Sequence, residues 1–154
     1  MIVGVDISTT AIHTAWIDGT GAPRRWHCTL GKPTTPIQDR VRAVHMQWPP
    51  TVTEICVEYP FGRSRTGLAS MMAVVGAVTK SAPSYCRVAW ISSGDLRRAI
   101  GSKNNKEAAH DAIRDLMRDG SNYSDQIPGW SEHELDALVA AVGWAAILEA
   151  QDAA

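Results

Sequence analysis

The sequence lacks a long hydrophobic run and any pair of cysteines with metal-ligand spacing. No apolar stretch is long enough to span a bilayer, and the N-terminus has no basic region followed by an apolar stretch and a cleavage site. We therefore expect a cytoplasmic protein. Cys28, Cys56 and Cys86 are widely spaced and odd in number, so we interpret them as reduced residues of the core.

The chain also has no internal repeat and no low-complexity segment, which excludes a repeat array. Its 154 residues fit one domain with a sizeable core and leave no room for a second comparable one. We expect a single domain over residues 1–154.

Acidic residues are scarce in the middle of the chain, although the net charge is only −1. From Arg63 to Lys106 there are eight Lys/Arg residues and one acid, Asp95. From Glu107 onward there are ten acids and two arginines. A solvated surface explains many charge runs, but a cationic middle also suits a polyanion and an acidic last third suits cations.

Five segments have the β-branched, apolar or alternating pattern of strands, and the gaps between later strands have helical patterns. The strands are expected at residues 2–6, 11–17, 23–30, 53–58 and 85–91. The helices are expected between Pro36 and Pro49 and at residues 68–80, 93–100, 106–118 and from Ser131 onward. The last helix begins with a capping-box pattern, with Ser131 as N-cap and Glu134 three residues on. A turn at residues 18–21 makes the first three strands antiparallel. This order predicts an α/β fold: a five-stranded mixed sheet, three strands antiparallel and then two parallel, with helices on its faces.

Four side chains that can bind metal ions fall at the ends of these elements. Asp6 lies in the first strand and Glu58 ends the fourth, while His133 and Asp136 are three residues apart on one face of the last helix. That face continues through small or apolar residues able to lie against the sheet, namely Ala140, Gly143 and Ile147. Carboxylates with one imidazole suit Mg²⁺ or Mn²⁺ better than a structural zinc ion. Two such ions a few ångströms apart are the arrangement that hydrolyses phosphodiesters.

Four motifs of the chain resemble those of the RuvC-like Holliday junction resolvases, an endonuclease family of the RNase H-like superfamily. They are Val3-Gly4-Val5-Asp6, Val57-Glu58-Tyr59-Pro60-Phe61, Gly101-Ser102-Lys103-Asn104-Asn105-Lys106-Glu107 and His133-Glu134-Leu135-Asp136-Ala137-Leu138. The resemblance implies an RNase H-like fold and a homodimer. It also implies cleavage of four-way and other branched DNA with two Mg²⁺ ions, for which Mn²⁺ substitutes, held by the catalytic residues Asp6, Glu58, His133 and Asp136.

The resemblance also implies DNA-binding residues. Phe61 would stack on or wedge between bases, although an aromatic residue near a strand end commonly packs in a core. Lys103 and Lys106 would contact phosphates. Arg63 and Arg65 lie in the loop around Phe61 and are interpreted as phosphate contacts or as solvated charges.

Two other functions fit parts of the sequence. The stretch Gly4–Thr10 also resembles the first phosphate-binding motif of sugar kinases and actin-like ATPases, but the chain has room for one lobe only. A non-catalytic DNA-binding module would explain the basic middle but not the full set of four ligands. RuvC-like motifs also occur in debranching nucleases and in an RNA-processing branch, so the motifs leave the substrate open.

Overall fold

The computed structural model describes residues 1–59, 65–103, 105–120 and 127–154. Its strands are β1 (Ile2–Ile7), β2 (Ala11–Ile17), β3 (Pro23–Thr29), β4 (Glu54–Tyr59) and β5 (Arg87–Ser92). Its helices are α1 (Ile37–Arg42), α2 (Arg65–Ser81), α3 (Ser93–Ala99), α4 (Lys106–Gly120) and α5 (Glu132–Asp152), with a 3₁₀ turn at Ile127–Gly129. None of the helices in these described ranges is both long and apolar enough to cross a membrane.

The strands form one mixed sheet in the order β3-β2-β1-β4-β5. Strands β1, β2 and β3 are antiparallel, and β4 and β5 run parallel to β1. The predicted α/β sheet, with three antiparallel strands followed by two parallel ones, is therefore confirmed. The parallel pairs need long crossovers, which α1 and α2 supply.

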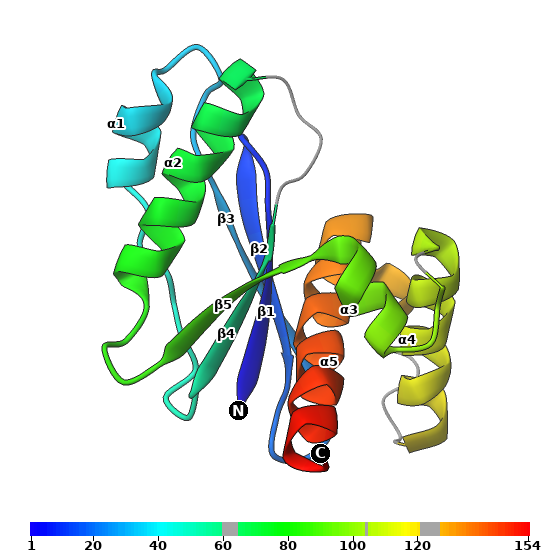
Figure 1. Cartoon of the computed structure of the whole chain (residues 1–154). Helices are drawn as coiled ribbons and strands as arrows, with labels where there is room; N and C mark the ends of the chain where they lie inside the picture. The colour runs from blue at the N-terminus through cyan, green and yellow to red at the C-terminus, as the bar shows by residue number, and fades with distance from the viewer. Residues whose placement is uncertain (60–64, 104, 121–126) are drawn as a thin grey trace.

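Helices cover both faces of the sheet, as Figure 1 shows. α1 and α2 lie on one side, and α3, α4 and α5 lie on the other. Because side chains alternate along a strand, Val3 and Val5 of β1 face α2, whereas Gly4 and Asp6 face α5. The sheet thus separates two apolar clusters, one built around α2 and one around α5.

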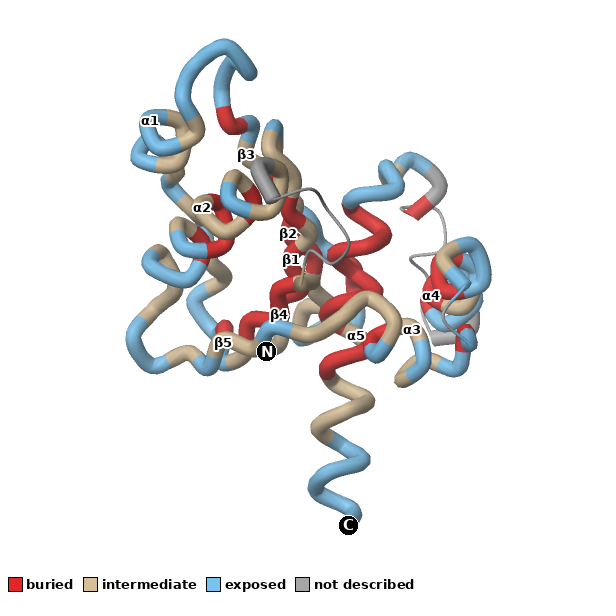
Figure 2. Tube along the Cα trace, turned by 45° about the horizontal axis from the view of Figure 1, so that its top comes forward, coloured by how far each residue is buried: buried red, intermediate tan, exposed pale blue. Residues whose placement is uncertain are grey.

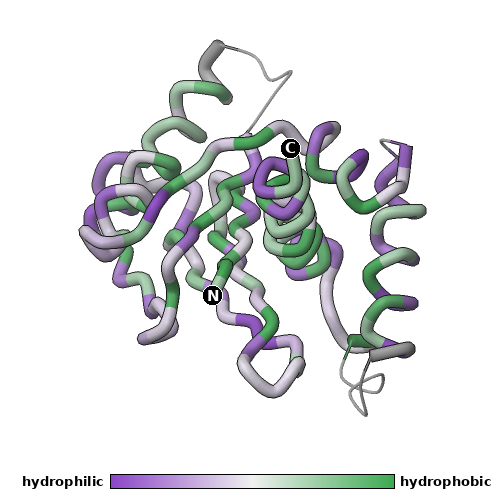
Figure 3. Tube along the Cα trace, turned by 60° about the horizontal axis from the view of Figure 1, so that its bottom comes forward, coloured by the Kyte–Doolittle hydropathy of each residue, from purple (hydrophilic) through white to green (hydrophobic). Residues whose placement is uncertain are grey.

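The buried residues concentrate in β1, β2, β4, α2 and the first half of α5, whereas β3 and β5 are mostly exposed or half-buried (Figure 2). Every residue from Glu134 to Ala141 is buried, although this helix begins at the surface with exposed His133. Helix α4 is more amphipathic, with Ala109 and Ile113 buried and polar residues between them (Figure 3). Burying a valine, leucine or isoleucine side chain contributes about 1.5–3 kcal/mol to stability. The two apolar clusters therefore supply the main stabilisation of the fold.

The helix expected between Pro36 and Pro49 is shorter than the sequence predicts. α1 ends at Arg42, and the segment that follows has no regular structure. Val44, Met46 and Trp48 still pack against the α2 cluster, and the Trp48 indole N–H donates to the Ser81 carbonyl oxygen at 2.9 Å. Tertiary contacts of this non-helical segment therefore outweigh its helical pattern.

Candidate metal centre

The two strand carboxylates, Asp6 and Glu58, lie at the C-terminal ends of neighbouring parallel strands. Val5 of β1 pairs with Val57 of β4, so the residue that follows each of them lies on the face covered by α5. A buried apolar strand leads into each carboxylate. The sheet therefore brings together two acids that are 52 residues apart in the sequence.

The first turn of α5 is fixed beside these carboxylates by its N-cap. Ser131 accepts a hydrogen bond from the Glu134 amide, and the Glu134 carboxylate accepts one from the Ser131 amide at 2.7 Å. This is the capping box that the sequence predicts. Arg25 of β3 donates to the same Glu134 carboxylate at 2.5 Å and lies over the Trp130 ring, so the helix start is also tied to the sheet.

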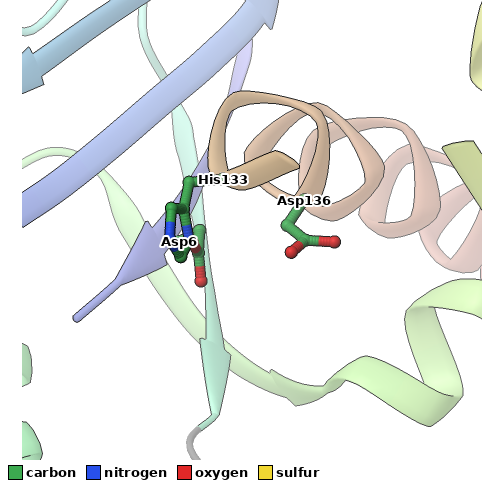
Figure 4. Close-up of side chains that lie close together, drawn as sticks. All are labelled: Asp6, His133 and Asp136. Atoms are coloured by element: carbon green, nitrogen blue, oxygen red, sulfur yellow. The ribbon is translucent and has the colours of Figure 1, made fainter. Parts of the chain in front are cut away.

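His133 from the first turn of α5 and Asp136 from the second lie close to Asp6 (Figure 4). The His133 Nδ1 atom lies 2.7 Å from Asp6 Oδ2. One ligand atom from each of the three residues lies within 4.8 Å of the others, which is close enough to share a metal ion. The spacing of three between His133 and Asp136 is what allows one helix to supply both candidate ligands.

Glu58 lies outside that group of three but is electrostatically part of the site. Burial, followed by the negative charges of Asp6 and Asp136, raises the pKa of Glu58 to about 7. The Arg97 guanidinium and a hydrogen bond from Ser93 act in the opposite direction. Glu58 is thus a fourth ligand candidate, coupled to Asp6 and Asp136 through its charge.

The surroundings of the Asp6 carboxylate disfavour its ionised form. Burial raises its pKa to about 6 despite the hydrogen bond from His133, and the charge of Asp136 acts in the same direction as burial. A buried carboxylate with a raised pKa gains by binding a cation. The donor set of carboxylate oxygens and one imidazole, together with this excess of negative charge, fits a divalent metal ion.

Two cationic or donor side chains of α4 pair with Asp136. Lys106 Nζ lies 2.8 Å from Oδ2, and His110 Nε2 lies 2.9 Å from Oδ1. Lys106 also contacts Glu132 at 3.2 Å. Lys106, expected to bind phosphate, therefore lies directly at the acidic cluster.

A row of histidines that the sequence patterns did not single out extends from His133 across the sheet. The His13 ring stacks on His133 with 5.1 Å between centroids, and His27 stacks on His13 at 6.0 Å. His13 is the antiparallel register partner of both Asp6 and His27. The signal was present in the hairpin: pairing Ile17 with Pro23, the facing ends of the two strands, and counting back four residues pairs these two histidines.

The hydroxyl residues after Asp6 serve the turn between β1 and β2. Ser8 Oγ accepts hydrogen bonds from the Ala11 amide at 2.9 Å and from the Thr10 amide at 3.2 Å. Such local side-chain bonding is the usual role of serine in turns. It accounts for this stretch without a bound phosphate.

The expected DNA-binding residues are described to different extents. Phe61 and Arg63 lie outside the described residues, and Arg65 is described only by its backbone position as the first residue of α2. Lys103 is exposed just before α4 and has a positive φ of 50°. Lys106 is thus the first residue of α4 and contacts the acidic cluster, and Lys103 lies three residues before it.

Comparison with protein-family models and with curated protein sequences finds no match to this chain. Solved structures do match. T. thermophilus RuvC in complex with Holliday junction substrate aligns with a TM-score of 0.68 and 18% identity, over 97% of this chain and 95% of that chain. A second Thermus thermophilus RuvC structure aligns with a TM-score of 0.63 and 17% identity, over 97% and 96% of the two chains.

The chain has the RNase H-like fold of RuvC. The alignment runs nearly end to end, so it includes the sheet, α5 and the helices between them. This confirms the fold that the motif resemblance implied.

Proposed function

We propose that the protein is a metal-dependent, structure-specific endonuclease that cleaves four-way Holliday junctions and related branched DNA. The observation that carries the proposal is the convergence of Asp6, His133 and Asp136 within 4.8 Å, with Glu58 beside them, on a RuvC fold. One of the similar RuvC structures is a complex with Holliday junction substrate. Junctions of this kind arise in DNA recombination and repair, and we propose that the protein acts on them in the cytoplasm.

The catalytic residues in this proposal are the metal ligands Asp6, Glu58, His133 and Asp136. Two Mg²⁺ ions, or Mn²⁺ in their place, would supply activation of the attacking water and stabilisation of the leaving oxygen. The protein contributes a rigid set of ligands: Asp6 and Glu58 come from central strands, and the other two come from the first two turns of a capped, buried helix. Rigid positioning of this kind is the main requirement for phosphodiester hydrolysis.

We propose that the lysine and arginine residues near the metal centre bind the DNA. Lys106 begins α4, Lys103 lies three residues before it, and the charge of Arg97 reaches Glu58. Phosphate contacts from these side chains would place the scissile bond over the carboxylates, with no dependence on sequence. Arg63 and Arg65 would extend the phosphate contacts, and Phe61 would stack on bases at the branch point.

We also propose that two chains assemble as a homodimer through α2. A four-way junction has two equivalent strands to cut, whereas the described part of each chain has one acidic cluster that could hold metal ions. The outer face of α2 carries small residues, among them exposed Gly76 and partly exposed Ala73 and Ala77, and borders a groove of about 430 Å³ with α1. A second copy of this helix fits such a face, because small residues let two helices approach closely.

The decisive experiment incubates labelled four-way, three-way and linear duplex DNA with the protein, in Mg²⁺ and in EDTA. We expect paired nicks in the four-way junction in Mg²⁺ only. The Asp6→Asn variant should lose cleavage while still binding the junction, and Asp111→Asn, which changes an exposed carboxylate of α4, should cleave normally. Absence of metal-dependent cleavage of any branched substrate by the folded wild-type protein would overturn the proposal.

A further inference from the structure

The two oxygens of the Asp136 carboxylate have partners of different character. Oδ1 accepts from His110 Nε2 at 2.9 Å, and Oδ2 pairs with Lys106 Nζ at 2.8 Å. Both partners come from α4, one turn apart. Asp136 itself is buried, so it can change its orientation only if these partners allow it.

His110 is a fixed partner. Its side chain is 7% exposed, and it lies between α4 and α5, where Ala109 and Ile113 pack in the same apolar cluster as Leu135. An imidazole has two rotatable bonds, and burial against neighbouring side chains holds both. Its hydrogen bond therefore fixes the plane of the Asp136 carboxylate.

Lys106 is a partner that can leave. Its side chain is 33% exposed and also contacts the exposed Glu132 carboxylate at 3.2 Å. A lysine has four rotatable bonds and a strongly hydrated ammonium group, so moving it into solvent costs little. Oδ2 is thus the Asp136 oxygen that a divalent cation can reach once the ammonium group moves away.

We propose that His110 is a positioning residue that holds Asp136 Oδ1 and thereby presents Oδ2 as the single metal-binding oxygen of this side chain. The inference rests on the proposed function, because it assigns His110 a role toward the divalent cation of that site. His110 itself stays outside the ligand set. Hydrogen-bonding partners of metal ligands contribute about 10–100-fold to metal affinity, by fixing the ligand before the ion arrives.

The test measures Mn²⁺ affinity, by electron paramagnetic resonance of the free ion and by calorimetry, without DNA or turnover. His110→Gln keeps an N–H donor, whereas His110→Phe fills the same space without one. We expect His110→Gln to bind Mn²⁺ within threefold of wild type and His110→Phe to bind at least tenfold more weakly, with unchanged circular dichroism. His45→Gln, which changes an exposed histidine after α1, should have no effect.

Equal affinities of the wild type and a folded His110→Phe variant would overturn this inference and leave the proposed function standing. A folded wild type that binds no Mn²⁺ would overturn both. If His110→Phe fails to fold, ¹⁵N resonances of the wild-type imidazole decide the question. We expect the Nε2–H signal to persist when diamagnetic Mg²⁺ saturates the site, whereas loss of that proton would show that His110 is itself a ligand and overturn the inference.

Discussion

Gly4 of β1 lies directly beneath the Ala137 carbonyl group of α5. A β-carbon on Gly4 would stand 1.9 Å from the Ala137 oxygen and 2.4 Å from the Ala141 amide nitrogen. The helix backbone therefore rests on the strand backbone with no side chain between them. This close approach seats the first turn of α5 over Asp6, two residues further along the strand.

We expect Gly4→Ala to lower the free energy of unfolding by about 3 kcal/mol, because α5 must move away from the sheet to admit the methyl group. The same shift should weaken Mn²⁺ binding, since His133 and Asp136 move with the helix. Urea unfolding measures the first effect. Gly19→Ala is the control: nothing lies within 4 Å of a β-carbon at that position, so stability should stay within about 1 kcal/mol of wild type. A fully stable Gly4→Ala variant would contradict this account of the packing.

The strands and the candidate ligands at their ends could be predicted from the sequence because both depend on local pattern. Asp6 and Glu58 follow apolar runs, and a parallel pair of strands brings such ends to one edge. The capping box of Ser131 and Glu134 likewise fixed where α5 begins and which turn carries His133. Local signals of this kind survive in the folded state when tertiary contacts act in the same direction.

The contacts around the site could not be predicted from the sequence, because they depend on how the helices pack. The sequence face through Gly143 was expected to meet the sheet, but Gly143 lies against the Leu96 backbone of α3, and Ala137 and Ala141 meet β1 instead. α5 is buried on nearly every side, so its hydrophobic pattern selects no single face. The contact of His110 with Asp136 depends on the same packing and has no signature in either helix alone.

The raised pKa values at the site predict opposite effects of pH on the metal-free and metal-bound protein. The pKa values of Asp6 and Glu58 rise to about 6 and about 7, from ordinary values of 3.8 and 4.5. The native state therefore holds protons that the unfolded chain has released. The free energy of unfolding of the metal-free protein should fall as the pH rises from about 4 to about 7, by about 1.4 kcal/mol per pH unit for each proton that only the native state retains.

Metal binding needs the ionised carboxylates, so Mg²⁺ affinity should rise over the same pH range. The increase in Tm on adding Mg²⁺ should consequently be larger at pH 8 than at pH 5.5, as thermal unfolding at both pH values can show. The double variant Asp6→Asn, Glu58→Gln should lose both the pH dependence and the response to Mg²⁺. An equal Mg²⁺ response of the wild type at the two pH values would argue against these carboxylates as ligands.

The proposed dimer predicts that a large charged side chain on the outer face of α2 separates the chains. Gly76 is exposed there with no atom within 4 Å of a β-carbon, so Gly76→Arg is tolerated by the fold but would clash with a second copy. We expect the wild type to sediment as a dimer and Gly76→Arg as a monomer that nicks one strand without coordinated cleavage of the other. Ala108→Arg, at an exposed position of α4, should remain dimeric. A monomeric wild type that still makes paired nicks would contradict the assembly.

Lys103 and Lys106 are predicted to differ in their effect on the metal, although both are expected to contact phosphates. The Lys106 ammonium group lies 2.8 Å from Asp136 Oδ2 and competes with a metal ion for that oxygen, whereas Lys103 is exposed before α4. We therefore expect Lys106→Met to bind Mn²⁺ more tightly than wild type in the absence of DNA, and Lys103→Met to bind it equally.

Each variant should bind junction DNA more weakly, with the slope of log affinity against log salt reduced by about 0.9, because each loses one phosphate contact. Calorimetry with Mn²⁺ and fluorescence anisotropy with labelled junctions separate the two effects. Weaker Mn²⁺ binding by Lys106→Met would show instead that the lysine supports the ligand set, since removal of a competing cation can only strengthen metal binding.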